Sequence, residues 1–348
     1  MLRHAGSVAA MTLVFLLVPV AMITGAAGLA TAEMEPRDPS VEAPDTADLG
    51  KPPILYRDEL EQPDTLGVGR VARNVSEHLP ALDALASWFA SRIGGLGYAR
   101  ARPVVARDNA EMIEFLRRGI VDVVSETPLS AIHFVKAAGA TILLRESRGG
   151  RATYDSVVFV RKDSPIHTLA DLGSHRVAFE DSGSTTAFLL PLAGIKRTGL
   201  ATVALATPMQ AAPKDAAGYF FALSETAIVA AVARDVADAG ALSSEEWKAA
   251  EAAQPTTISG LRIIYESNEI PRAFVLTGPT VSAEQRAGLG KLLLEMNSDA
   301  DGRETLDRYN KIDRLSAIDA ETERSIADLE ETWSLVHAEL SGAVQGAN

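Results

Sequence analysis

Three consecutive hydroxyl residues, Ser184, Thr185 and Thr186, have the types and spacing to bind an anion. They follow Gly183, come after an apolar run that predicts a strand, and open a run that predicts a helix. The first turn of a helix has unpaired backbone N–H groups and about half a positive charge. Hydroxyls beside these groups add donors aimed at the same point, so the turn could hold a tetrahedral oxyanion without a lysine. The alternative is a plain helix cap, although three hydroxyls exceed what a cap needs.

Ser125, Glu126 and Thr127 directly precede a second predicted helix. That helix starts at Pro128, and proline is typical of a first helical turn. These side chains could contact a ligand, and helix capping is again the alternative. Glu126 would repel a dianion. Three alternatives would remove this repulsion. The ligand could also carry an amine, the Glu126 side chain could point away, or Glu126 could be protonated and share its proton with the oxyanion.

Ser224, Glu225 and Thr226 form a third helix start of this kind. Ser224 is expected to cap the helix, and the helix dipole favours Glu225 near the N-terminus. Contact of Ser224 and Glu225 with a ligand is the functional alternative. Other acidic pairs, such as Glu245-Glu246, are predicted to lie on solvated helix faces.

The sequence lacks the patterns of catalytic and metal sites. The chain has 348 residues and no cysteine, so it forms neither a disulfide nor a thiolate metal site. Its six histidines have no metal-ligand spacing, and no nucleophile elbow, P-loop or dinucleotide-binding glycine motif occurs. We therefore expect a binding protein without a cofactor or metal rather than an enzyme.

Strand and helix patterns alternate from residue 65 onward, which predicts an α/β fold with mostly parallel sheets covered by helices. The predicted strands are 66–71, 102–105, 121–124, 140–144, 156–161, 176–179, 237–242, 261–265 and 271–276. The predicted helices are 79–93, 109–118, 128–138, 169–172, 185–198, 224–235, 282–297, 300–309 and 320–337. A chain of this length, of which 47% is hydrophobic, suits two lobes.

The N-terminal residues have the pattern of an export signal. Arg3 precedes an apolar run, and Ala30-Thr31-Ala32 fits a small-residue cleavage site. We expect residues 1–32 to be a signal peptide cleaved after Ala32, with an uncleaved membrane anchor as the alternative. Its removal takes the formal charge from −13 to −14, which disfavours nucleic acid as a partner. Residues 33–64, rich in Pro, Asp and Glu, are predicted to be a flexible lead-in, with an ordered but irregular arm packed on the first lobe as the alternative.

Residues 154–191 contain a series of short motifs in a fixed order. They are Tyr154, Ser156, Asp163-Ser164, 169–172, 177–179, Asp181, Ser184-Thr185-Thr186 and Pro191. In order and spacing they resemble the phosphate/phosphite/phosphonate-binding proteins of ABC transporters. The pattern of that family is a Tyr-x-Ser strand, Asp-Ser, Leu-x-Asp-Leu, a Val-Ala-Phe strand, an Asp-x-x-Ser-Thr-Ser/Thr turn and a later proline. Weaker matches at 118–123, 235–241 and 266–271 extend the resemblance over roughly residues 65–335.

The resemblance implies a two-lobed type II periplasmic binding protein fold. Each lobe would be a mostly parallel sheet flanked by helices, with two crossover strands between the lobes and the ligand in the cleft. The implied lobes are residues 65–155 plus 265–340 and residues 156–264. At 222–226 the chain departs from the family's Gly-Ser-His-Asp, so the identity of the ligand does not carry over.

The resemblance also bears on single residues. It favours the anion-binding interpretation of the hydroxyls at 184–186. It places Tyr154 near the crossover, where the ring could contact the ligand or be a buried part of the hinge. Arg73, which follows the first strand, is a candidate charge partner, whereas Arg148 and Arg151 are predicted to be solvated.

The function implied is an exported, periplasmic solute-binding protein, expected to be monomeric. It would capture a phosphate- or phosphonate-type oxyanion for an inner-membrane ABC permease. The alternative is a periplasmic sensory protein that presents an oxyanion or another small ligand to a membrane histidine kinase.

Overall fold

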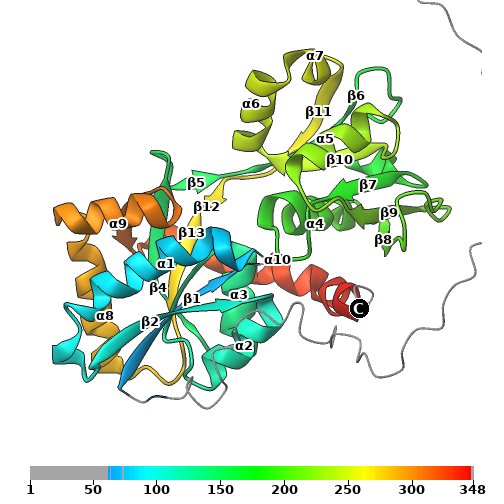
Figure 1. Cartoon of the computed structure of the whole chain (residues 1–348). Helices are drawn as coiled ribbons and strands as arrows, with labels where there is room; N and C mark the ends of the chain where they lie inside the picture. The colour runs from blue at the N-terminus through cyan, green and yellow to red at the C-terminus, as the bar shows by residue number, and fades with distance from the viewer. Residues whose placement is uncertain (1–61, 63, 73, 346–348) are drawn as a thin grey trace, which may run out of the picture. The chain divides into compact units, whose positions relative to one another are not determined.

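Two six-stranded sheets form the frame of the molecule (Figure 1). The structure is a computed structural model that describes residues 62, 64–72 and 74–345. The predicted signal peptide 1–32, nearly all of the lead-in 33–64 and the candidate residue Arg73 therefore lie outside the described residues. Among the helices that are described, none combines the length and the apolar content needed to cross a bilayer.

The first sheet is parallel at one side and antiparallel at the other. Its strands, in spatial order, are β14 (Ile312–Ala317), β4 (Thr141–Arg148), β13 (Ala273–Thr277), β3 (Val123–Glu126), β1 (Thr65–Val71) and β2 (Arg100–Ala106). β1 runs parallel to β2 and β3, whereas β13 is antiparallel to both β3 and β4.

Helices cover both faces of the first sheet, because neighbouring strand residues point to opposite sides. Val123 packs in one hydrophobic cluster and Val124 in another. The Val123 cluster includes residues of α1 (Val75–Ala90), η3 (Gly94–Leu96), α8 (Ala283–Glu295) and α9 (Ala300–Asn310). The Val124 cluster includes residues of α2 (Asn109–Arg117) and α3 (Pro128–Ala138).

The second sheet has the same layered construction. Its strands, in spatial order, are β11 (Leu261–Glu266), β6 (Ser156–Arg161), β10 (Ala239–Ser243), β7 (Arg176–Phe179), β9 (Ala216–Phe221) and β8 (Ala201–Ala204). The run β10-β7-β9-β8 is parallel, and β6 is antiparallel to β10 and β11. Two hydrophobic clusters pack against this sheet. One includes residues of η4 (Leu169–Leu172), η5 (Thr185–Leu189) and α4 (Leu190–Arg197). The other includes residues of α5 (Glu225–Ala233), α6 (Ser244–Ala253) and α7 (Pro255–Ile258).

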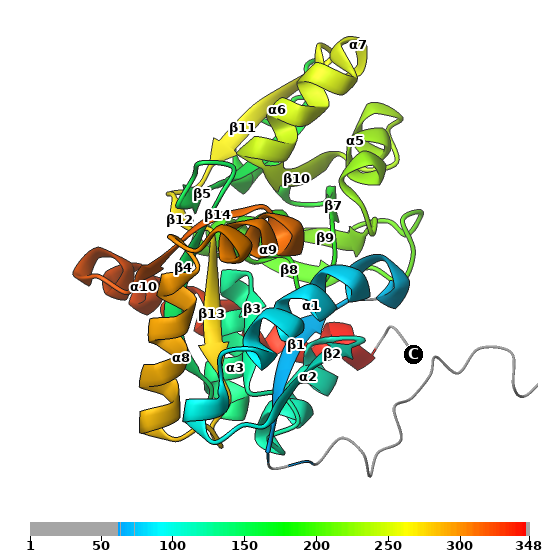
Figure 2. The same ribbon diagram turned by 60° about the vertical axis from the view of Figure 1, so that its left-hand side comes forward.

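Two short strands connect the sheets. β5 (Thr153–Tyr154) leads into the second sheet and β12 (Ile270–Pro271) leads back to the first, and the two pair antiparallel. Figure 1 and Figure 2 both show this ribbon where the chain passes from one sheet to the other.

The C-terminal helix α10 (Ala320–Gln345) contacts helices of both sheets, and it lies beside α3 and α4 in Figure 1. Glu330 forms a 2.5 Å ion pair with Lys136 of α3, and the Arg197 guanidinium of α4 donates to the Thr332 hydroxyl at 2.9 Å. Trp333 packs against hydrophobic clusters of both sheets. Helix α10 is therefore a further connection between the sheets, besides the two crossover strands.

The predicted alternation of strands and helices is confirmed. The predictions at 128–138, 156–161 and 176–179 coincide with α3, β6 and β7. Strands β8, β9 and β14 were not predicted. β9 reads Ala-Ala-Gly-Tyr-Phe-Phe, a short run without alternation that local pattern cannot assign. Its Gly218 permits close packing, since a Cβ there would lie 2.9 Å from the Leu205 side chain.

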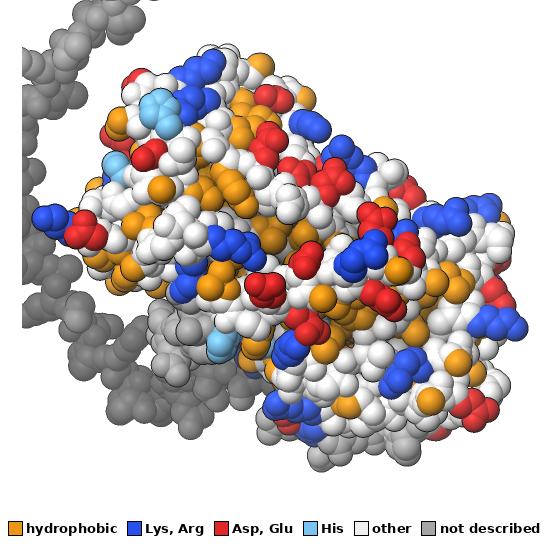
Figure 3. Space-filling view, turned by 180° about the vertical axis from the view of Figure 1, so that it is seen from behind, with side chains coloured by type: hydrophobic (Ala, Val, Ile, Leu, Met, Phe, Trp, Pro, Cys, Tyr) orange, Lys and Arg blue, Asp and Glu red, His pale blue; other side chains and the backbone are white. Residues whose placement is uncertain are grey.

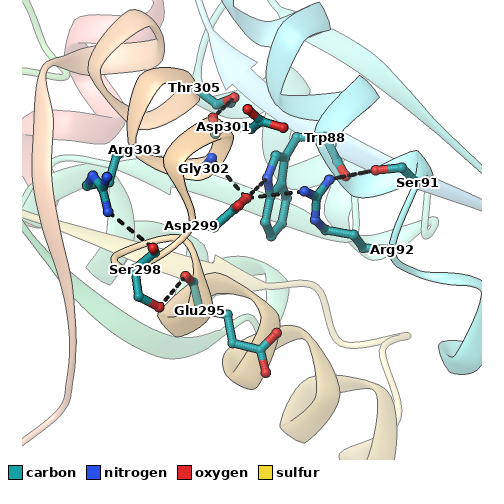
Figure 4. A network of polar contacts seen from close by, with 10 residues as sticks. All are labelled: Trp88, Ser91, Arg92, Glu295, Ser298, Asp299, Asp301, Gly302, Arg303 and Thr305. Carbon is teal, nitrogen blue, oxygen red and sulfur yellow. Dashed lines mark hydrogen bonds and ion pairs between the residues drawn. The ribbon is translucent and has the colours of Figure 1, made fainter.

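Asp299 joins the end of α1 to the start of α9 (Figure 4). Its Oδ2 accepts hydrogen bonds from the Trp88 indole at 3.0 Å, the Arg92 guanidinium at 3.2 Å and the Gly302 N–H at 3.0 Å. The hydrogen bond from Trp88 is the largest cause that holds the pKa of Asp299 below its usual value of 3.8. The carboxylate therefore caps α9 and anchors it to α1.

We predict that Asp299→Asn lowers the melting temperature at pH 7 by roughly 2–4 °C. Because the folded-state pKa is depressed, the carboxylate stabilises the fold above pH 3.8 and loses this effect as the pH falls through the folded-state pKa. The difference between the variant and the wild type should therefore shrink in acid, as measured by thermal melts across pH. Asp301→Asn, an exposed position on the same turn, is the matched control. Equal melting of wild type and Asp299→Asn at pH 7 would contradict this role.

Candidate ligand-binding site

The carboxyl ends of the parallel strands in both sheets lie at the crossover. In the first sheet, Glu126 at the end of β3 pairs with Phe274, which follows β12 closely. In the second, Ser243 at the end of β10 pairs with Ser156, two residues after Tyr154. Ligands of open α/β sheets bind outside the carboxyl ends of the strands. The crossover region is therefore where a ligand site is expected.

The hydroxyl turn at 184–186 opens with a π-helical segment rather than the predicted uninterrupted helix 185–198, which is a correction. Ser184 is the N-cap, and its hydroxyl accepts the Ala187 N–H at 3.1 Å. Pro191, the second residue of α4, has no N–H to donate to the Ala187 carbonyl four residues earlier, so the α-helical hydrogen bonds of α4 cannot extend back to that carbonyl. That carbonyl instead accepts the Glu180 N–H at 3.2 Å. This missing α-helical hydrogen bond accounts for the irregular turn that precedes α4.

Thr185 connects the turn to the first sheet. Its hydroxyl accepts the backbone N–H of Leu129 at 2.9 Å, and Thr185 is 2% exposed. Leu129 is the second residue of α3, whose own N-cap, Thr127, makes no side-chain cap bond. The hydroxyl of Thr185 thus takes the place of a cap from a distant part of the chain. Its oxygen occupies a position at which the N-terminus of α3 can hold an anionic oxygen.

The other two residues of the turn are also held in place. Thr186 is buried, and its carbonyl accepts the Ser156 hydroxyl at 2.5 Å. Gly183 brings the turn close to α2, since a Cβ there would lie 3.7 Å from the amide nitrogen of Asn109. The hydroxyl turn is therefore positioned by contacts from both sheets.

Ser125 belongs to a buried charged group in the first sheet. Its hydroxyl donates to Glu146 Oε1 at 2.5 Å, and Glu146 is fully buried. Arg148 pairs with the other oxygen of Glu146 at 2.6 Å, with 12% of its side chain exposed. The prediction that Arg148 is solvated was wrong, because a buried carboxylate needs an opposite charge. Arg151 is 45% exposed and lies 3.6 Å from Glu245.

Glu126 is turned toward the end of β1, where its Oε1 accepts the Val71 N–H at 3.2 Å. Burial raises the pKa of Glu126 to about 7, and the nearby Arg70 and Arg148 only partly oppose this shift. Near neutral pH the carboxyl is therefore divided between its charged and neutral forms.

Tyr154 is 4% exposed, and among the described residues its hydroxyl makes no hydrogen bond of good geometry, although the Thr185 side chain lies close enough to lower its pKa. The Arg272 guanidinium carbon lies 4.4 Å from the ring centroid, a cation–π contact. Burial raises the pKa of Tyr154 to about 12, so the phenol remains protonated and can donate. A buried, unpaired donor at the crossover is a ready contact for an oxyanion.

Acidic side chains gather at the carboxyl edge of the second sheet. Burial raises the pKa of Glu180 to about 7, and Asp181, Glu225 and Glu246 add to the shift by repulsion. Ser224 caps α5 as predicted, with its hydroxyl accepting the Ala227 N–H. The expectation of a solvated Glu246 was wrong: the residue is half-buried and forms a capping box with Ser243.

Sequence reasoning missed Arg272, Glu146 and Glu180 as members of this region. Arg272 directly follows the Ile-Pro turn of the crossover, and Glu180 precedes Asp181 of the recognised pattern, so both had local signals. Glu146 had none, because only the folded chain brings it to Ser125.

No group of His, Asp or Glu side chains in the described part of the chain is arranged to hold a metal ion. The site thus consists of hydroxyls, helix N-termini, two guanidinium groups and several carboxylates. That set can bind a small polar ligand by hydrogen bonds and charge.

The fold is that of type II periplasmic binding proteins, as predicted, and similar solved structures share it. XAC2383 from Xanthomonas citri bound to ATP matches with a TM-score of 0.74 and 28% identity, over 81% of this chain and 99% of that chain. PhnD1 from Prochlorococcus marinus in complex with methylphosphonate matches with a TM-score of 0.58 and 16% identity, over 79% and 99%. The binding protein PA3383 of an ABC phosphonate transporter from Pseudomonas aeruginosa matches with a TM-score of 0.56 and 21% identity, over 80% and 89%.

Residues 73–322 match the model of the family described as "ABC transporter, phosphonate, periplasmic substrate-binding protein". The chain belongs to this family. Its members are periplasmic, bind small ligands for ABC transporters and are not enzymes.

We predict that Thr185→Val lowers the free energy of unfolding by about 1 kcal/mol, because it leaves the buried Leu129 N–H without an acceptor. Urea denaturation would measure the change. Thr185→Ser, which keeps the hydroxyl, should retain most of the stability. Equal losses in both variants would show that the methyl group, not the hydrogen bond, is what matters.

Proposed function

We propose that this protein is exported and captures a phosphate- or phosphonate-type oxyanion for an inner-membrane ABC permease. The two sheets with their helices, 65–155 plus 265–340 and 156–264, act as lobes that close about the crossover strands. The observation that carries the proposal is the bond between the Leu129 amide and the Thr185 hydroxyl. It joins an anion-attracting helix N-terminus to the hydroxyl turn at the crossover.

The proposed donors come from both lobes. The N-terminus of α3, with Thr127 half-exposed beside it, supplies backbone N–H groups and a hydroxyl. Ser184 and Thr186 supply the opposing turn, and the unpaired phenol of Tyr154 donates from the crossover. Ser125 acts through the buried Glu146–Arg148 pair, which fixes the end of β3. Arg73, which directly follows β1 and Ala72 in the sequence, is proposed as a charge partner of the anion.

The charges near the site favour a ligand that carries an ammonium group as well as an oxyanion. Glu180, Glu225 and Glu246 lie together in the second lobe, where they would attract a cation. An aminophosphonate has both groups. XAC2383, 28% identical, is bound to ATP, whose phosphates are also tetrahedral oxyanions. That likeness supports an anionic phosphorus group as the common feature.

The surface agrees with a small ligand rather than a polyanion. On the face seen in Figure 3, Lys and Arg side chains lie among Asp and Glu side chains and apolar patches. A nucleic acid needs a continuous basic surface, and the mature chain has a formal charge of −14.

Calorimetric titration of the mature chain with phosphate, methylphosphonate, 2-aminoethylphosphonate and ATP tests the proposal, with sulfate as a control. We expect micromolar or tighter binding of at least one phosphorus compound and weaker binding of sulfate. Ser184→Ala should weaken the best ligand roughly tenfold, the effect of about 1.4 kcal/mol. The absence of heat with every phosphorus compound would overturn the ligand class.

The affinity for an oxyanion should fall as the pH rises from 6 to 8, because Glu126 and Glu180 lose their protons near pH 7. We predict that Glu126→Gln binds roughly threefold to tenfold better than wild type at pH 8 and about equally at pH 6. Titration of both proteins with the same ligand at each pH cancels the ligand's own ionisation. A constant ratio across pH would contradict a titrating Glu126 at the site.

We further propose that export includes cleavage after Ala32 and that the mature protein is monomeric. Intact-mass spectrometry of the secreted chain, followed by size-exclusion chromatography with light scattering, would test both points. A retained N-terminal segment would favour a membrane anchor.

A further inference from the structure

Leu223 lies at the carboxyl edge of the second sheet, two residues after the end of β9. Its N–H donates to the Glu180 carbonyl at 2.9 Å, and the preceding Ala222 N–H donates to Phe179 at 2.8 Å. These bonds continue the pairing of β9 with β7 past the strand ends. Because the Glu180 N–H donates in turn to the Ala187 carbonyl of η5, two successive hydrogen bonds connect the backbone of Leu223 to that turn.

The conformation of Leu223 is unfavourable for its side chain. Its φ of 67° is in the left-handed region, where the Cβ of an L-residue crowds the backbone. The other non-glycine residues with positive φ in the described part of the chain are polar or charged: Ser174, Asp215, Asp235 and Lys311. A glycine or asparagine would satisfy the same turn without this strain.

Packing does not offset the strain, because Leu223 is 62% exposed. An isolated exposed leucine needs no explanation, and neither does one residue with positive φ. The combination is different, since both properties disfavour leucine at a position that two backbone hydrogen bonds connect to the hydroxyl turn. Strained residues of this kind gather at binding sites.

We propose that Leu223 is a specificity-determining residue whose side chain contacts the organic substituent of the bound ligand. The inference rests on the proposed function, in which the anionic group is held at 184–186. A phosphonate carries its substituent on a carbon–phosphorus bond, so a carbon chain extends from the anchored group. Burial of each methylene against leucine improves the affinity roughly fourfold.

Leu223→Gly removes the side chain and relieves the strain, so the variant should melt no lower than wild type. Leu223→Asn is a second variant, since asparagine tolerates the left-handed region but offers no apolar contact. Lys311→Gly, a substitution at the left-handed C-cap of α9, is the matched control. Calorimetry would measure the affinity of each protein for inorganic phosphate, methylphosphonate and butylphosphonate.

Wild type and Lys311→Gly should bind butylphosphonate more tightly than methylphosphonate. In Leu223→Gly and Leu223→Asn, butylphosphonate should lose roughly tenfold in affinity, while inorganic phosphate stays within about twofold of wild type. Equal losses of affinity for butylphosphonate and inorganic phosphate in the Leu223 variants would overturn the role of Leu223 and leave the proposed function intact. Unchanged affinities of these variants for both ligands would do the same. Failure of wild type to bind any of the three probes would overturn the proposed function and this inference together.

Discussion

The antiparallel pairing of β5 with β12 is the constraint on which the arrangement of the candidate site depends. Tyr154 pairs with Ile270 and Thr153 with Pro271, so the outgoing and returning chains are bonded at one place. A strand of each sheet starts next to this ribbon, β6 after β5 and β13 after β12. The registers of these strands with their neighbours bring the carboxyl edges of both sheets to the ribbon. Helix N-termini follow those edges, which is why capping groups and unpaired N–H groups converge there.

The absent backbone N–H of Pro191 shapes the hydroxyl turn. Pro191 lacks the N–H that would extend the hydrogen bonds of α4 back to Ala187, and the Ala187 carbonyl accepts the Glu180 N–H instead. The helix therefore opens with an irregular turn, in which the Thr185 hydroxyl faces the N-terminus of α3. A regular α-helix at this position would place the three hydroxyls differently, because successive side chains would be separated by a fixed rotation.

The local charge in this region depends on buried ion pairs and on burial of carboxyl groups, not on the net charge of the chain. The chain is acidic, yet it holds Arg148 beside Glu146 inside the first sheet and stacks Arg272 on Tyr154. Burial raises the pKa of Glu126 and Glu180 to about 7, which reduces the negative charge that an oxyanion would meet. The same carboxylates, when ionised, are suited to an ammonium group.

The sequence by itself determined the elements whose signals are local. The spans of α3, β6 and β7, the Ser224 cap and the α/β class follow from apolar periodicity, a starting proline and a capping hydroxyl. Two features of the 184–186 turn were also local, its hydroxyls and its position after a strand.

Only the tertiary structure decided which groups meet. Ser125 bonds to a residue 21 positions away, and Leu129 bonds to Thr185, 56 positions away. Burial of Arg148 depends on Glu146 and on the strands that enclose both. The strain at Leu223 depends on where β9 ends against β7. Such properties arise from contacts between segments that are distant in the sequence. A local sequence pattern does not specify which distant segments will pack against it.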